Sequence, residues 1–367
     1  MKLRYKIAGG FVTLMVLGIS ILAVTISHNS ACPQVASTPE YENPMQAVVY
    51  RCYGSPEVLQ YETIEKPVPA DNEVLVKVKA AGVNPLDWHY MRGSPYIMRL
   101  GTGIGAPKET RLGVDFAGTV EAVGVNVKQF KPGDDVFGGG AGAFAEYVTV
   151  TEDRALARKP DNMSFEQAAS VPIAGITALQ ALRDKGQLQP GQKVLINGAS
   201  GGVGTFAVQI ARTIGAEVTG VCSERNIGMV RSLGADRVID YKKENYTGSG
   251  KQYDLIIDMI GNHSLSDNRK VMAPRATLVI VGGSKGDWIG PLWGPVWASM
   301  YSPFVSQQFK LLLAKMRKAD LDTLAELMQS GYVTPVIDRT YPLSDVPAAI
   351  RYSEEGHARG KIIINME

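Results

Sequence analysis

The sequence predicts an α/β protein in which a doubly wound parallel sheet is joined to a β-rich domain. Three observations predict this class. Residues 193–204 form an apolar strand pattern that breaks into a glycine-rich turn, and after about residue 169 strand patterns alternate with helical ones. The region before them is rich in strand patterns and glycine. The 367 residues, 45% of them hydrophobic, are ample for two domains.

The N-terminus differs from the rest of the chain. Residues 7–26 carry no charge, and as a helix they would span about 30 Å, enough to cross a bilayer. Lys2, Arg4 and Lys6 precede this stretch, and the next basic residue is Arg51. The positive-inside rule then places the N-terminus in the cytosol and the body on the far side. We expect a single-pass membrane anchor and linker over residues 1–44. A cleaved signal peptide, which would leave a secreted or lumenal protein, is the alternative.

Charge and cysteine content exclude several classes. The chain has 38 basic and 36 acidic residues, and without Lys2, Arg4 and Lys6 the two charges nearly balance, which argues against a nucleic-acid partner. The three cysteines, Cys32, Cys52 and Cys222, have unrelated spacings that predict neither a disulfide framework nor a zinc site. We therefore expect a body that is reduced or indifferent to redox state.

The β-rich domain is expected over residues 45–168. Its strands are predicted near 45–50 and 73–83 and within 113–124 and 135–150. The parallel-sheet domain is expected over 169–318. Its strands are predicted at 194–197, 217–222, 236–240, 254–258 and 276–281, and its helices at 203–214, 225–233 and 263–272. Residues 319–367, with a helix near 320–330 and strands near 333–340 and 360–365, return to the first domain.

An aromatic stretch from Trp288 to Phe309 interrupts this pattern. It is compatible with a membrane-touching surface or with a lid over an apolar substrate. We favour packing between the two domains, because large aromatic side chains are most often buried in cores and interfaces.

The glycine-rich turn predicts a dinucleotide site. Ala199-x-Gly201-x-x-Gly204 is the dinucleotide fingerprint with alanine at its first position, and it lies between a strand and an amphipathic helix. Glycines there let the backbone approach a pyrophosphate, which lies on the exposed N–H groups at the helix N-terminus. The expected phosphate contacts are Ser200, Gly201, Gly202, Val203 and Gly204.

Together these segments resemble the medium-chain dehydrogenase/reductase superfamily, in its zinc-free, quinone-oxidoreductase-like branch. The resemblance covers residues 45–367. Its motifs are Ala81-Gly-Val-Asn-Pro-Leu-Asp-Trp88, Leu112-Gly-Val-Asp-Phe-Ala-Gly118, Lys131-Pro-Gly-Asp134, Ala174-Gly-Ile-Thr-Ala178, Asn197-Gly-Ala-Ser-Gly-Gly-Val-Gly204, Leu233-Gly-Ala-Asp236, Ile239-Asp-Tyr241 and His357-Ala-Arg-Gly-Lys361. The resemblance implies a GroES-like barrel built from both ends of the chain, a Rossmann domain between them and an active site in the cleft. Homodimers are common in the family.

The resemblance also bears on metal binding. Zinc-dependent relatives have ligands where this chain has Asn84, Val114 and Pro172. A catalytic zinc ion needs about three N, S or O side chains, so we expect no metal.

NADPH is the expected cofactor. The second strand of the parallel sheet ends in Ser223, where NAD enzymes usually place an acid, and Arg225 and Asn226 follow. Glu224 is the counter-evidence, and we interpret it as a solvent-exposed side chain. By resemblance, Tyr241 borders the 2′-phosphate. The remaining expected cofactor contacts are Thr177, Ile260, Gly261, Gly282, Gly283 and Lys361.

The expected reaction is hydride transfer from NADPH to a quinone or an α,β-unsaturated carbonyl. Without a metal, hydrogen-bond donors must polarise the substrate carbonyl, and Asn84, His89 and Tyr96 are the candidates. Asp87 is expected to make a structural hydrogen bond. Two alternatives are an alcohol dehydrogenase or carbonyl reductase of the same superfamily, and a membrane-tethered NADPH-binding protein with little turnover.

Overall fold

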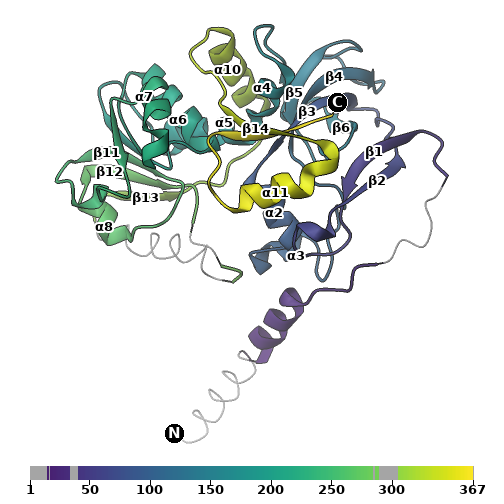
Figure 1. Ribbon diagram of the computed structural model, residues 1–367, viewed down its shortest axis with the longest axis horizontal. Coiled ribbons are helices and arrows are strands. Elements are labelled where there is room, and N and C mark those ends of the chain that lie inside the picture. Colours follow the sequence, from purple (N-terminus) through teal and green to yellow (C-terminus); the bar gives the residue numbers. More distant parts are fainter. Residues whose placement is uncertain (1–14, 16, 34–39, 284–285, 289–304, 367) are drawn as a thin grey trace, which may run out of the picture.

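The computed structural model describes the chain except residues 1–14, 16, 34–39, 284–285, 289–304 and 367. Two sheets organise the described residues, one six-stranded and one seven-stranded, with helices packed around each (Figure 1). A separate antiparallel pair, β1 (Pro44–Val49) with β2 (Gln60–Glu65), lies at the edge of the lobe that holds the seven-stranded sheet.

The six-stranded sheet is parallel and has the order β10-β9-β8-β11-β12-β13. Its strands are β8 (Lys193–Asn197), β9 (Glu217–Cys222), β10 (Arg237–Asp240), β11 (Tyr253–Asp258), β12 (Met272–Ile280) and β13 (Gln308–Leu311). From β8 the chain adds β9 and β10 on one side, and it then returns to place β11 on the other side of β8. The switch point of the topology therefore lies between β8 and β11, and ligands of such sheets bind at the carboxyl edge there.

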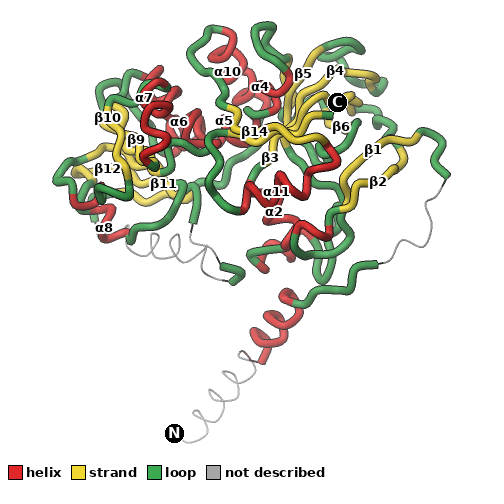
Figure 2. The backbone as a smooth tube through the Cα atoms, viewed as in Figure 1, coloured by secondary structure: helices red, strands yellow, loops and turns green. Residues whose placement is uncertain are grey.

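Both faces of this sheet are covered, which explains its continuous apolar strands. Val194 and Ile196 face a core shared with Phe206, whereas Leu195 faces a second core shared with Ile256. Helices α6 and α7 lie on one face and α8 on the other (Figure 2). The helices of this lobe are α5 (Pro172–Gln180), α6 (Gly202–Ile214), α7 (Ile227–Ser232) and α8 (Leu265–Arg269), with shorter turns η3 (Ala181–Lys185), η4 (Glu224–Asn226) and η5 (Tyr246–Gly248).

The seven-stranded sheet joins both ends of the chain. Its order is β14-β15-β3-β4-β5-β7, with β6 paired to β3, and all pairs are antiparallel except β14 with β15. The strands are β3 (Glu73–Val83), β4 (Asp115–Val123), β5 (Asp135–Gly139), β6 (Tyr147–Thr151), β7 (Leu156–Arg158), β14 (Ile337–Pro342) and β15 (Lys361–Asn365). The helices around it are α2 (Pro85–Arg92), α3 (Arg99–Thr102), α4 (Phe165–Ala169), α10 (Lys318–Gln329) and α11 (Val346–Glu354), with turns η1 (Pro56–Val58), η2 (Tyr96–Met98) and η7 (Leu343–Asp345).

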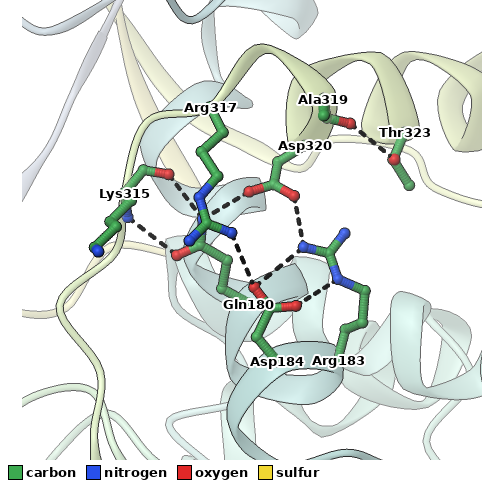
Figure 3. Close-up of polar contacts among 8 residues, drawn as sticks. All are labelled: Gln180, Arg183, Asp184, Lys315, Arg317, Ala319, Asp320 and Thr323. Carbon is green, nitrogen blue, oxygen red and sulfur yellow. Dashed lines mark hydrogen bonds and ion pairs between the residues drawn. The ribbon is translucent and has the colours of Figure 1, made fainter.

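A buried polar cluster holds the returning chain against the six-stranded lobe. Asp320, in the first turn of α10, accepts hydrogen bonds from Gln180 Nε2 (2.7 Å) and Arg183 Nη2 (2.6 Å), both at the end of the α5–η3 helix (Figure 3). Gln180 also exchanges two hydrogen bonds with the backbone of Lys315. Because Asp320 is buried, its carboxylate needs these partners.

Several elements differ from the sequence prediction. The helix expected at 263–272 is shorter, α8, because β12 already begins at Met272 and pairs there with Tyr253. The helix expected at 225–233 is divided into η4 and α7. Strands β2 and β13 were not expected, since both are short and lack clear apolar alternation.

The N-terminal region differs from the sequence prediction in the state of its cysteines. Cys32 and Cys52 form a disulfide, so the prediction of reduced cysteines is wrong. Their spacing of 20 residues matches no framework, and only the path of the chain after residue 27 brings them together. Residues 17–27 are helical. No helix in the described part of the chain is both long and apolar enough to cross a bilayer. Residues 7–14 and 16 of the expected anchor, and most of the aromatic stretch, lie outside the described residues.

Candidate active site

The glycine-rich turn between β8 and α6 has the geometry of a phosphate-binding loop. Gly198 has φ +93°, a conformation that favours glycine. A Cβ on Gly204 would lie 2.2 Å from the carbonyl oxygen of Gly198, so only glycine lets helix and turn pack this closely. A Cβ on Gly201 would meet nothing nearer than 3.5 Å, which leaves open space beside the helix N-terminus. The first-turn amides of α6 have no intrahelical acceptors and therefore suit an anion.

Three polar side chains meet where β8 and β9 end. The Asn226 amide nitrogen donates to Ser200 Oγ (3.0 Å) and lies 3.3 Å from Ser223 Oγ. The Asn226 side-chain oxygen is buried and has no donor among the residues that the structure describes. Such an orphaned acceptor indicates a missing donor, such as a sugar hydroxyl.

Glu224 does not contribute to this corner. Its carboxylate pairs with Lys243, and both side chains are exposed. The structure therefore confirms the interpretation of Glu224 as a surface residue. Arg225 is exposed and donates to the carbonyl of His357 (2.6 Å), and the half-exposed Tyr241 follows β10 beside the end of β9.

The turn after β11 is organised by Asp258. Its Oδ1 accepts hydrogen bonds from the backbone N–H groups of Ile260 and Gly261 (both 3.0 Å) and from Asn197 Nδ2 (2.9 Å). Ile260 keeps 48% of its surface exposed at the carboxyl edge. Three other expected contacts, Gly282, Gly283 and Thr177, follow β12 or lie buried on α5.

The C-terminal segment contacts the glycine-rich turn directly. Gly360 N–H donates to the carbonyl of Ser200 (2.9 Å), and Gly360 pairs with Gly201 in a parallel bridge. A Cβ on Gly202 would approach the side-chain stem of Lys361 to 3.1 Å. The start of β15 therefore joins the phosphate loop to the seven-stranded sheet.

Beneath this contact lies a buried polar cluster. Lys361 Nζ donates to Asn84 Oδ1 (2.5 Å) and to the carbonyl of Val83 (3.0 Å), and lies 3.4 Å from Asp115 Oδ2. Asn84 Nδ2 donates to Asp115 Oδ2 (2.9 Å) and to the carbonyl of Gly82 (3.2 Å). All three side chains are buried.

This cluster changes the roles expected for two residues. Both amide hydrogens of Asn84 are already donated, so it has none for a substrate oxygen, contrary to the sequence prediction. The ammonium of Lys361 is directed into the cluster, and only its stem lies beside the phosphate loop. Asn84 is therefore a positioning residue in this arrangement.

Asp87 completes the cluster at the start of α2. Its Oδ2 accepts from the backbone N–H of Asn84 (2.7 Å), which confirms the structural hydrogen bond expected for it. The pKa of Asp87 is raised to about 7, chiefly by complete burial and in part by the neighbouring Asp115 carboxylate. Burial also raises the pKa of Asp115, while the charge of Lys361 opposes the rise.

His89, in the last turn of α2, and Tyr96, at the start of η2, differ in what they can donate. His89 Nδ1 lies 2.6 Å from the carbonyl of Ser94, so this nitrogen carries the proton and Nε2 is left as an acceptor. Burial lowers the pKa of His89 and favours this neutral form. Tyr96 packs edge-on against Trp288, and its hydroxyl has no hydrogen-bond partner among the described residues.

Sequence reasoning missed Asp115 and Asp258. Each is an acid next to a buried apolar strand segment, and a buried carboxylate in such a place usually organises backbone N–H groups. That pattern was the available signal.

Two regions of the sequence match known protein families. Residues 70–161 match the alcohol dehydrogenase GroES-like domain, and residues 233–364 match a family described as zinc-binding dehydrogenase. A chloroplast envelope quinone oxidoreductase homolog of Arabidopsis thaliana is 35% identical over 343 residues, 87% of this chain and 98% of the relative. The chain belongs to the medium-chain dehydrogenase/reductase superfamily, in its zinc-free, quinone-oxidoreductase-like branch.

Two further known proteins are similar to this chain. An NADPH-dependent alkenal/one oxidoreductase of Arabidopsis thaliana chloroplasts is 33% identical over 360 residues, 94% of this chain and 86% of that protein. The quinone oxidoreductase structure from Coxiella burnetii superposes with a TM-score of 0.78 at 28% identity, covering 89% of this chain and all of that one.

Proposed function

We propose that this chain is an NADPH-dependent oxidoreductase that reduces a quinone or an α,β-unsaturated carbonyl compound without zinc. The observation that carries the proposal is the corner formed by Ser200, Ser223 and Asn226 beside the glycine-rich turn. It has hydroxyl groups and an orphaned acceptor, and the acid next to it in sequence, Glu224, is paired with Lys243 on the surface. Names of relatives that include NADPH, quinones and enones support the same reading.

The residues present fit the cofactor. We assign the pyrophosphate to the N-terminus of α6, and the ribose and 2′-phosphate to Ser223, Asn226, Arg225 and Tyr241. Ile260 and Gly261, held by Asp258, would border the dinucleotide at the carboxyl edge. Bound NADPH would supply a hydride.

This chain's own residues would bind and orient the substrate. Tyr96 is the group we assign as donor to the substrate oxygen, since its hydroxyl has no hydrogen-bond partner in the part of the chain that the structure describes. Neutral His89 has its N–H group directed to the carbonyl of Ser94 and therefore has no proton to offer a substrate carbonyl. Asn84, Lys361 and Asp115 would position the loop and β15 rather than touch the substrate.

We also propose a division into two domains and an N-terminal membrane anchor. Residues 45–168 with 319–367 would form the catalytic domain, 169–318 the cofactor domain, and residues 7–26 a membrane anchor preceded by Lys2, Arg4 and Lys6.

The test is reduction of 9,10-phenanthrenequinone and of a simple enone by purified full-length protein with NADPH or NADH. We expect turnover with NADPH and at least about tenfold weaker use of NADH, by the charge logic of the β9 corner. Calorimetry run in parallel separates a binder from an enzyme. Binding without oxidation would refute the enzyme, and no heat with either nucleotide would refute the cofactor site.

A further inference from the structure

A short segment between α2 and β4 has its polarity inverted. Ile97, Leu100 and Ile104 expose 43%, 49% and 53% of their surfaces, whereas Arg99 between them exposes 1%. In a soluble protein the arginine would face water and the aliphatic side chains would face the core. We call the three aliphatic residues the η2–α3 patch.

Arg99 is buried without a carboxylate partner among the described residues, because it binds backbone carbonyls instead. Its guanidinium donates to Gly93 (2.7 Å), Ile26 (3.0 Å) and His28 (3.1 Å). The last two carbonyls belong to the end of the N-terminal helix, where a cation is favourable to the helix dipole. Arg99 therefore fixes the helix end beside the patch.

Two more ties hold the same junction. Ser30 N–H donates to the carbonyl of Gly105 (2.9 Å), and the disulfide joins Cys32 to Cys52. Figure 1 shows the helix leaving the body beside α3. The patch and the helix exit thus lie on one side of the protein.

The helix itself exposes apolar side chains. Leu17, Ile19, Ile21, Leu22 and Val24 each expose 48% to 70% of their surface. They belong to the uncharged stretch 7–26, which is long enough for a bilayer. A helix that is apolar all round is covered by protein or by lipid, and among its described residues only Ile26 is buried against the body. Lipid is therefore the expected cover for this helix and for the adjoining η2–α3 patch.

We propose that the η2–α3 patch inserts into the bilayer interface beside the N-terminal helix, so that the substrate is a lipid-soluble quinone or enone entering from the membrane. Tyr96 begins the same segment, and its backbone N–H and ring contact Asp287 and Trp288 from the other lobe. The segment therefore joins the lipid-facing surface to the site we assign to the substrate. The substrate part of this proposal rests on the proposed function.

The first experiment measures access to substrate. Full-length protein in phosphatidylcholine vesicles reduces either a tail-less quinone or the same headgroup with an isoprenoid tail, with NADPH outside the vesicles. The variant is Ile97→Asn/Leu100→Asn/Ile104→Asn. The control is Val68→Asn/Val125→Asn, two valines that are each 84% exposed. We expect KM for the tailed quinone to rise about tenfold in the variant only, with activity on the tail-less quinone unchanged. Equal behaviour of variant and control would overturn the proposal.

The second experiment does not depend on activity. A nitrobenzoxadiazole label at Leu100→Cys should be quenched by a lipid carrying a shallow spin label, and the same label at Val68→Cys should not. Native Cys222 is buried and the other cysteines are paired. Absence of quenching at position 100 would refute membrane contact even if the enzyme is active. Quenching without turnover on either quinone would refute the proposed function and the substrate class, and leave the membrane surface standing.

Discussion

The ammonium of Lys361 donates to the side-chain oxygen of Asn84 at 2.5 Å, across 277 positions of sequence. This contact connects the last strand of the chain to the start of α2, directly beneath the phosphate loop. Both groups are buried, so each depends on the other for compensation.

Lys361→Met should destabilise the protein by about 3–5 kcal/mol, because Asp115 and Asn84 would lose a buried cationic partner. Urea unfolding followed by circular dichroism measures the change. Lys243→Met is the matched control, since its pair with Glu224 is exposed and should contribute little to the free energy of unfolding. Similar losses of unfolding free energy in both variants would show that buried Lys361 stabilises the protein no more than exposed Lys243 does.

Asp87 predicts a pH dependence of stability. Its folded pKa, about 7, lies above the unfolded value near 3.9, so the folded state holds a proton that the unfolded state has released. Stability should therefore fall as pH rises from about 4 to about 7. Asp87→Asn keeps the oxygen that accepts from Asn84 N–H and should flatten this slope in urea titrations at several pH values.

Asp267→Asn provides the control for this slope. A hydrogen bond from Lys270 lowers the pKa of Asp267, an exposed residue at the start of α8. Its contribution is lost as pH falls below about 4, outside the tested window. An unchanged slope in Asp87→Asn would mean that Asp87 is ionised in the folded protein.

Ser223→Asp should shift nucleotide preference towards NADH. A carboxylate at the end of β9 would repel a 2′-phosphate and accept hydrogen bonds from ribose hydroxyls. We expect kcat/KM for NADPH to fall at least about tenfold, with NADH improved. Glu224→Gln, one residue away on the surface, should change neither value. A reversed pattern between the two variants would place Glu224 at the ribose.

Gly204→Ala should abolish nucleotide binding, because its Cβ would lie 2.2 Å from the carbonyl of Gly198 and push α6 away from the turn. Gly228→Ala in α7 has no atom within 4 Å of the new Cβ and should be neutral or stabilising by about 0.5 kcal/mol. Calorimetry with NADPH and thermal unfolding measure both. Normal binding by Gly204→Ala would rule out the turn as the phosphate site.

Much of the architecture was readable from local sequence. The strand at 193–197, the helix at 203–214 and the glycines between them are specified by periodicity and turn chemistry within a dozen or so residues. The sequence also identified Ser223 and Asn226 as neighbours at the end of β9. The contact of Asn84 with substrate stays a prediction, because whether an amide is free depends on which groups the fold brings to it, here Asp115 and the carbonyl of Gly82.

The sequence by itself determined the class of fold, the glycine-rich turn between β8 and α6 and the superfamily, since each depends on residues close together in the chain. Only the tertiary structure decided that Lys361 meets Asn84, that Cys32 pairs with Cys52, and that Arg99 is buried while its neighbours are exposed. These contacts join distant segments, and the path of the whole chain, which no local pattern encodes, determines whether two such segments meet.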